Sequence, residues 1–282
     1  MKTLSSIRET RTLVRAARHQ GKTIGFVPTM GALHAGHISL VRAAKSRSGF
    51  VVASIFVNPT QFGPTEDFSR YPRTFEADQE KLKAEGVDLL FAPSVEEMYP
   101  AGAVTFVNVE QISERLDGRS RQGHFRGVAT VVAKLFSIVE PDIAFFGQKD
   151  AAQAAIIKRM VRDLMFPIEI VVAPIVREPD GLALSSRNTY LSLEERRQAT
   201  VLSRALGEVE ARFNNGETSA ENLIAVARQV FASAPSVRVD YVEIVDPETL
   251  EEVSVARQGA LVAVAAFVGS TRLIDNVVLG ST

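Results

Sequence analysis

Apolar and polar positions in the first half of the chain predict strands and helices in alternation. Continuous β-branched apolar runs are typical of strands buried on both faces, and apolar residues at helical spacing predict the helices between them. The expected strands cover residues 23–27, 50–57, 87–91, 104–107, 142–146 and 168–172. The expected helices cover about 7–20, 38–44, 75–86, 128–139 and 151–164. This alternation predicts an α/β fold with a doubly wound parallel sheet.

The pattern changes after Pro174, where a hinge-like turn is expected at residues 177–181. Helical patterns at about 192–213 and 219–232 follow, and then come strand candidates at 237–245, 261–268 and 272–278. Helices followed by strands predict a separate, smaller α+β domain. We therefore expect two domains, at residues 1–175 and 176–282.

Composition narrows the class of protein. A chain of 282 residues with 46% hydrophobic and 23% charged residues is ordinary for a globular protein. A net charge of −1 argues against binding nucleic acid or a membrane surface through bulk charge, and the absence of cysteine excludes disulfides and thiol catalysis. No apolar run reaches the length of a membrane span and the first residues lack a signal-peptide pattern, so a cytoplasmic location is expected.

The stretch at residues 28–40 joins a predicted strand to a predicted helix through two glycines and two histidines, His34 and His37. Such a turn favours phosphate, because backbone N–H groups and the positive end of the helix dipole meet there. The spacing of Gly31 and Gly36 imitates a Walker A loop, but His37 and Ile38 replace the required Lys and Ser/Thr. A metal site would need a third ligand, and none is obvious nearby. A turn with two solvated histidines is the remaining alternative.

Three more polar turns need an explanation. Asn58 and Gln61 follow one predicted strand, and Lys149 and Asp150 follow another. Right-handed crossovers place these turns at the same sheet edge as the histidines. A solvated loop amide is the alternative for Gln61, and a helix cap for Asp150. The fourth turn, residues 185–187, lies on the expected hinge, where it could complete the site when nucleotide binds. Together the four turns indicate adenylyl transfer, in which a carboxylate becomes an acyl-adenylate that an amine can attack.

Four sequence blocks carry a family resemblance. They are P-T-M-G-A-L-H-A-G-H-I-S-L at 28–40, F-V-N-P-T-Q-F-G-P-T-E-D-F at 56–68, F-F-G-Q-K-D at 145–150 and D-G-L-A-L-S-S-R-N at 180–188. The H-x-G-H motif alone marks the wider nucleotidyltransferase superfamily, but the set resembles the pantothenate synthetase (pantoate–beta-alanine ligase) family. The resemblance implies a Rossmann-like domain for nucleotide and pantoate, with a smaller lid domain. It also implies condensation of pantoate with β-alanine through a pantoyl-adenylate, converting ATP to AMP and pyrophosphate with Mg²⁺, in a cytoplasmic homodimer.

The resemblance also implies roles for particular residues. Those expected to bind ATP are Met30, Gly31, Ala32, Leu33, His34, Ala35, Gly36, His37, Gly147, Gln148, Lys149, Asp150, Val176, Leu184, Ser185, Ser186 and Arg187. Among these the expected catalytic residues are His34, His37, Lys149, Ser185, Ser186 and Arg187, and the expected substrate-binding residues are Asn58, Gln61 and Gln153. Ala152 stands where relatives often carry glutamine, which affects how Gln153 would be oriented. The Mg²⁺ ligands are not legible: phosphates should supply most of them, and Asp78 is only a guess.

Other residues and other functions were weighed. His19 and His124 are interpreted as structural or solvated, with His124 at a helix start. The nearest rival function is adenylation of a phosphate-bearing substrate such as pantetheine phosphate. A regulatory module that senses nucleotide without turnover is the rival from another class, and the presence of so many chemically active residues argues against it.

Overall fold

The computed structural model describes residues 1–64 and 66–281, so Thr65 of the second sequence block lies outside the described part. The chain divides into two compact units, and each combines separate stretches of sequence. The first unit consists of Met1–Ser113, Arg121–Gly147 and Ile156–Pro174, and the second of Glu114–Ser120, Gln148–Ala155 and Ile175–Thr282. The predicted division of labour between residues 1–175 and 176–282 stays a prediction.

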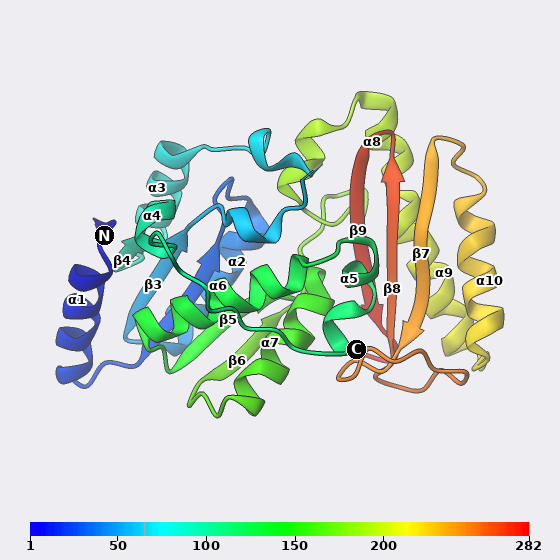
Figure 1. Ribbon diagram of the computed structural model, residues 1–282. Coiled ribbons are helices and arrows are strands. Elements are labelled where there is room, and N and C mark those ends of the chain that lie inside the picture. Colours follow the sequence, from blue (N-terminus) through cyan, green and yellow to red (C-terminus); the bar gives the residue numbers. More distant parts are fainter. Residues whose placement is uncertain (65, 282) are drawn as a thin grey trace. The chain divides into compact units, whose positions relative to one another are not determined.

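The first unit is built on a six-stranded parallel sheet in the order β1-β4-β3-β2-β5-β6 (Figure 1). The strands are β1 Lys2–Leu4, β2 Ile24–Thr29, β3 Phe50–Ile55, β4 Leu89–Phe91, β5 Ile143–Gly147 and β6 Glu169–Ala173. The predicted doubly wound parallel sheet is therefore confirmed. The strand order reverses beside β2, whose neighbours are β3 and β5. The carboxyl edge at such a reversal is where open α/β sheets bind ligands.

Helices cover both faces of this sheet. Those of the first unit, with the short 3-10 turns η, are α1 Ile7–His19, α2 Ala35–Arg47, η1 Pro59–Gln61, η2 Asp67–Ser69, α3 Phe75–Ala84, α4 Val95–Met98 and α6 His124–Val139; η3 Ile112–Glu114 and α7 Ala151–Asp163 run across the unit boundaries. Helices α2 and α3 share one apolar layer, and α1 packs against α6 in the other. Successive residues of β2 divide between the layers, because Phe26 meets Phe136 of α6 edge-on while Val27 joins the core beneath α2. This double burial explains the continuous apolar runs.

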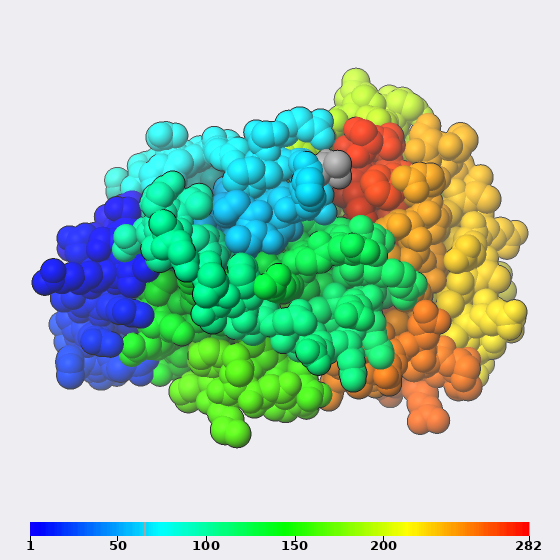
Figure 2. All heavy atoms as spheres, viewed as in Figure 1, coloured from blue at the N-terminus to red at the C-terminus, as the bar shows by residue number. Residues whose placement is uncertain are grey.

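Two local predictions fail in the first unit. Strand β1 was missed because it is a three-residue edge strand whose register depends on β4, with Leu4 opposite Phe91. Conversely, Val104–Val107 is not a strand. Its backbone is tied to α6 instead, since the Val107 N–H donates to Thr130 Oγ1 at 2.9 Å. Val104 is 83% exposed, and this segment lies on the surface of the unit (teal in Figure 2).

The second unit contains a three-stranded antiparallel sheet in the order β7-β8-β9. Its elements include α5 Asp117–Ser120, η4 Gln148–Asp150, η5 Ser186–Tyr190, α8 Leu193–Ala199, α9 Val201–Asn214, α10 Ala220–Phe231, β7 Val237–Val245, β8 Leu261–Val268 and β9 Thr271–Val278. Helices α9 and α10 pack on the sheet through one apolar cluster, as the predicted α+β arrangement requires. The helix expected at 192–213 is divided at Thr200, whose hydroxyl donates to the Arg197 carbonyl.

None of the helices in the described residues is both long enough and apolar enough to cross a membrane.

Candidate active site

Two histidines build the N-terminus of α2. His34 is the N-cap residue, and its Nδ1 accepts a hydrogen bond from the Gly36 N–H at 3.2 Å. His37 reaches back, so that its Nδ1 accepts from the His34 N–H at 3.3 Å. The two rings lie 4.1 Å apart between centroids. A side chain at Gly36 would place its Cβ 2.9 Å from the His34 ring, so glycine is required for this packing.

The capping bonds determine which ring nitrogen carries the proton. A nitrogen that accepts from a backbone N–H has no proton of its own, so a neutral imidazole at either position is protonated at Nε2. Both histidines can therefore present an Nε2–H donor at a helix N-terminus, where the dipole already favours negative charge. This arrangement suits a phosphate group.

The turn before α2 is held by Asp78 of α3. Its fully buried carboxylate accepts from the N–H groups of Ala32 at 2.7 Å and Leu33 at 2.8 Å. Ala32 is a non-glycine residue with a φ of 50°, and Gly31 before it has a φ of 84°. A left-handed alanine is unfavourable unless its surroundings impose it. Asp78 supplies that constraint, and because both of its oxygens bind backbone, a structural role is favoured over the metal ligation that we considered.

The second turn, after β3, is densely hydrogen-bonded. Gln61 is 7% exposed, and its Nε2 donates to Met30 Sδ at 2.9 Å, which joins this turn to the histidine turn. Asn58 is completely buried; its Nδ2 donates to Gln61 Oε1 and to the Gly127 carbonyl, both at 3.1 Å. Burial raises the pKa of Tyr99, so its hydroxyl stays protonated and donates to Asn58 Oδ1 at 2.8 Å. Asn58 therefore orients Gln61, and its own predicted contact with substrate stays a prediction.

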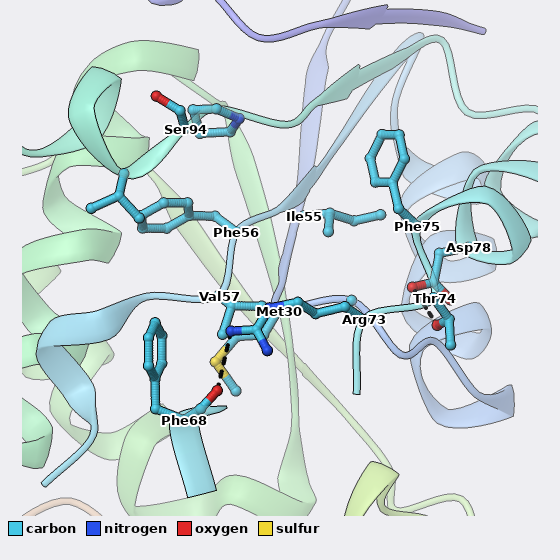
Figure 3. A pocket seen from close by; sticks show the side chains of 13 residues that line it. Met30, Ile55, Phe56, Val57, Phe68, Arg73, Thr74, Phe75, Asp78 and Ser94 are labelled. Carbon is cyan, nitrogen blue, oxygen red and sulfur yellow. Dashed lines mark hydrogen bonds between the residues drawn. The ribbon is translucent and has the colours of Figure 1, made fainter. Parts of the chain in front are cut away.

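A cavity of about 300 Å³ lies at the carboxyl edge of the first sheet (Figure 3). Met30 and Gly31 line it from the histidine turn, and β3 and the start of α3 supply most of the other walls. Arg73 at its rim donates to the carbonyls of Phe68 and Tyr71 at 3.1 Å each, so this guanidinium organises the loop before α3. The cavity provides apolar space beside the predicted nucleotide turn.

In the second unit, Asn276 of β9 holds the turn that contains Lys149. Its buried Nδ2 donates to the carbonyls of Gln148 and Lys149 at 2.9 and 3.0 Å, and the Gln148 side chain donates back to its Oδ1. Lys149 Nζ lies 3.6 Å from Asp150 Oδ1, and the lysine side chain is 20% exposed. Gln153 is half-buried in the first turn of α7, and Ala152 before it is buried. Lys149 therefore projects from a backbone that is fixed in place.

The predicted hinge at 177–181 is a tight hairpin. Arg177 and Ala183 form an antiparallel bridge, and the Leu184 N–H donates to the Val176 carbonyl at 3.0 Å. Arg177 also makes a bidentate ion pair with buried Asp275 of β9, at 2.6 and 3.0 Å. This hairpin leads directly into η5, where Ser185 caps the turn by accepting from the Arg187 N–H at 3.2 Å. The side chains of residues 184–187 are half-buried.

Each unit thus gathers its share of the expected site. The first brings together Met30, His34, His37 and Gln61 at one sheet edge, which also includes Gly147 at the end of β5. The second holds Gln148–Asp150 and residues 176–187 against β9. The roles assigned to individual residues stay predictions. Sequence reasoning missed the supporting groups Asp78, Arg177, Asp275 and Asn276, because each acts on a turn distant in sequence.

The described residues, 1–64 and 66–281, contain no cluster of three or more His, Cys, Asp or Glu side chains that could hold a metal ion. A metal in this site would take most of its ligands from substrate oxygens and water, which is the usual behaviour of Mg²⁺.

A parallel sheet that reverses its strand order beside a histidine-capped helix defines a nucleotide-binding α/β protein of the nucleotidyltransferase class. The family profile described as pantoate–beta-alanine ligase matches residues 2–278. The chain belongs to this ligase family, and the resemblance found in its sequence is confirmed.

Individual relatives agree over nearly full length. Pantothenate synthetase of Acidobacterium capsulatum is 62% identical over 293 residues, which span 100% of this chain and 98% of the relative. A crystal structure of pantothenate synthetase from Thermus thermophilus has a TM-score of 0.94 at 50% identity, covering 98% of this chain and 99% of that one. Pantoate–beta-alanine ligase from Francisella tularensis, solved in complex with beta-gamma ATP and beta-alanine, has a TM-score of 0.82 at 33% identity, covering 100% and 99%.

Proposed function

We propose that this ligase, which condenses pantoate with β-alanine using ATP, carries out the reaction through a pantoyl-adenylate bound at the histidine turn. The observation that carries the proposal is the pair of Nδ1-capped histidines, His34 and His37, at the N-terminus of α2. The ATP and β-alanine complex of the Francisella tularensis relative supports the choice of substrates.

In the first step, a pantoate carboxylate oxygen attacks the α-phosphorus of ATP, and the bond to the β-phosphate oxygen breaks to release pyrophosphate. Charge accumulates on the phosphate oxygens in this transition state. Nε2–H donors of His34 and His37, with the cations Lys149 and Arg187, stabilise that charge. Ser185 and Ser186 donate to the same phosphates, and Gln61 and Gln153 hold pantoate through groups that both donate and accept.

In the second step, the neutral amine of β-alanine attacks the carbonyl carbon of the adenylate. The bond from this carbon to the phosphate oxygen breaks, AMP leaves, and the nitrogen loses a proton as the amide forms. Holding the adenylate and the amine side by side makes the step effectively unimolecular, which can contribute up to about 7–11 kcal/mol to lowering the barrier. Mg²⁺ bound with the nucleotide would neutralise phosphate charge.

The second unit is proposed to act as the lid that supplies Lys149 and Arg187, and the active form as a cytoplasmic homodimer. These proposals rest on the family resemblance. Sedimentation analysis at assay concentrations tests the dimer, which predicts twice the 30.7 kDa mass of one chain.

Pyrophosphate release tests the function and separates it from both rivals. With ATP and pantoate alone we expect a single burst of pyrophosphate, and with β-alanine added we expect continuous turnover. Release that depends on pantetheine phosphate in place of pantoate would identify the rival adenylyltransferase. No release with either acid, together with tight ATP binding, would identify a nucleotide sensor.

A further inference from the structure

His124, which was interpreted from the sequence as a structural residue, lies directly behind the proposed substrate turn. It is the first residue of α6 and is 9% exposed. Its Nδ1 lies 2.8 Å from the backbone carbonyl oxygen of Gln61. The residue proposed to bind pantoate is therefore held from behind by a buried imidazole.

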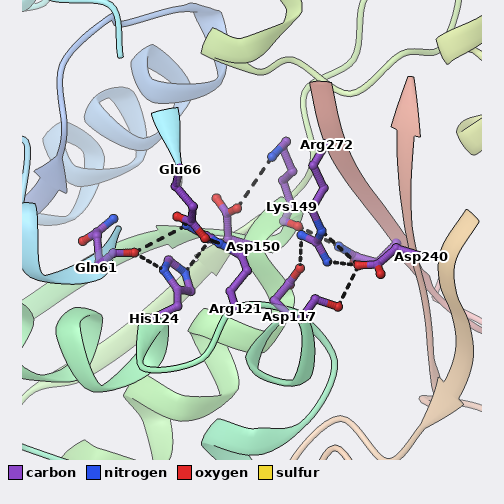
Figure 4. A network of polar contacts seen from close by, with 11 residues as sticks. Gln61, Glu66, Asp117, Arg121, His124, Lys149, Asp150, Asp240 and Arg272 are labelled. Carbon is purple, nitrogen blue, oxygen red and sulfur yellow. Dashed lines mark hydrogen bonds and ion pairs between the residues drawn. The ribbon is translucent and has the colours of Figure 1, made fainter. Parts of the chain in front are cut away.

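The neighbours of His124 determine its proton position. Arg121 Nη1 lies 2.9 Å from His124 Nε2, and a guanidinium can only donate, so Nε2 must accept. The imidazole proton is then on Nδ1, where it donates to the Gln61 carbonyl, which can only accept. Arg121 is oriented by Glu66 through two bonds of 2.7 and 2.8 Å, and its Nη2 also approaches the Gln61 carbonyl at 3.5 Å. Glu66, Arg121 and His124 thus form one directional chain of hydrogen bonds that ends at Gln61 (Figure 4).

The backbone of α6 reinforces this contact. A Cβ added at Gly127 would lie 2.3 Å from the Thr60 carbonyl oxygen and 2.7 Å from Gln61 Cα. The Gly127 carbonyl in turn accepts from Asn58 Nδ2 at 3.1 Å. Because helix and turn touch backbone to backbone, the turn has no room to relax toward α6, and the His124 bond determines its rotation.

We infer that Glu66, Arg121 and His124 are positioning residues for the acid substrate: they orient the backbone of Gln61 so that its side chain meets pantoate. The inference rests on the proposed function, since it assumes that Gln61 binds pantoate. None of the three touches the nucleotide turn through a contact in the first unit other than Gln61 itself. Their loss should therefore weaken the use of pantoate and leave the use of ATP unchanged.

The experiment compares two substitutions at one position. His124→Leu removes the donor to Gln61, whereas His124→Asn keeps an amide N–H near the position of Nδ1. Steady-state kinetics should give a KM for pantoate about tenfold higher in His124→Leu, equivalent to ~1.4 kcal/mol. The KM for ATP should stay within about twofold, the scale of an effect below 0.5 kcal/mol. His124→Asn should recover most of the lost pantoate affinity. Ser137→Ala, on the exposed side of the same helix, is the matched control and should match the wild type.

The outcomes are separable. If wild-type protein releases no pyrophosphate with pantoate, the proposed function is wrong and this inference falls with it. If the wild type turns over but His124→Leu keeps its KM for pantoate, or if both KM values rise together, only the inference is wrong. Equal loss in the Leu and Asn variants would also contradict it. Should His124→Leu fail to fold, Glu66→Gln provides the same KM comparison, because Glu66 lies nearer the surface and acts only through Arg121.

Discussion

At the scale of single residues, His34 and His37 serve the fold and the chemistry with different ring nitrogens. Each uses Nδ1 to satisfy a backbone N–H at the start of α2, which places the proton of a neutral ring on Nε2. The structural role therefore prepares the catalytic one, because the cap fixes both the tautomer and the direction of the remaining donor.

Replacing His37 with alanine should reduce kcat for pantoate-dependent pyrophosphate release by about 10²–10³-fold, the usual effect of losing one transition-state donor. The lost cap should lower the free energy of unfolding by only about 1 kcal/mol. Stopped-flow measurement of the burst and thermal unfolding separate the two effects. His19→Ala, at the exposed end of α1, is the control. Near-normal kcat in His37→Ala would remove this residue from the mechanism.

At the scale of elements, helix α3 holds the turn that precedes α2. Asp78 reaches from the first turn of α3 to two N–H groups of that turn, and Lys81 of the same helix donates to the Leu33 carbonyl at 2.6 Å. A left-handed alanine at position 32 persists because these contacts hold it. The geometry of the nucleotide turn is thus determined by an element that lies far along the chain.

Asp78→Asn tests this support. An asparagine presents an NH₂ group in place of one acceptor, which leaves a buried N–H without a partner and costs about 1–3 kcal/mol. We expect a lower melting temperature and a raised KM for ATP, with a smaller change in the KM for pantoate. Glu76→Gln, exposed on the same helix, should change neither. An Asp78→Asn protein with normal stability and kinetics would show that the turn holds its own shape.

The ion pair between Glu66 and Arg121 gives the α6 contact a pH dependence. Burial acts to raise the pKa of Glu66, but hydrogen bonds and charge from Arg121 outweigh it, and the net pKa is below the ordinary 4.5. A carboxyl with a lowered folded-state pKa stabilises the fold above its unfolded pKa, and this contribution is lost as pH falls through the folded value. Wild type should therefore be more stable than Glu66→Gln at pH 7, with the difference shrinking below about pH 4.5. Denaturant unfolding of both proteins across this range measures it. A constant difference would mean that Glu66 contributes by packing alone.

At the scale of the whole molecule, neither unit is a continuous stretch of chain. Residues 114–120 leave the first unit and join the second, where Arg272 of β9 pairs with Asp117 and Asp240. Ser120 also donates to Asp240 at 2.8 Å, and Arg115 pairs with Glu251 at 2.8 Å. Charged side chains thus attach a short segment to a sheet formed much later in the sequence.

Arg272→Met should destabilise the second unit by about 3–5 kcal/mol, because it leaves two carboxylates buried without their cation. Differential scanning calorimetry should report the loss as a lowered unfolding transition. Arg257→Met, in an exposed loop of the same unit, should leave the transition unchanged. A small effect for Arg272→Met would indicate that water replaces the guanidinium.

Much of the candidate site was already readable in the sequence. The apolar runs predicted five of the six parallel strands, since burial on both faces leaves a local signature, and the four motifs identified the family. Strand β1 and segment 104–107 escaped because what decides them is whether a partner lies beside them. Local pattern carries no information about such a partner.

The sequence by itself determined which residues are chemically active, because periodicity and motif spacing are local properties. Only the tertiary structure decided what holds those residues: Asp78 behind the histidine turn, His124 behind Gln61, and Asn276 behind Lys149. The physical reason is that a hydrogen bond depends on atoms meeting in space, and these pairs meet across separations of 46, 63 and 127 residues.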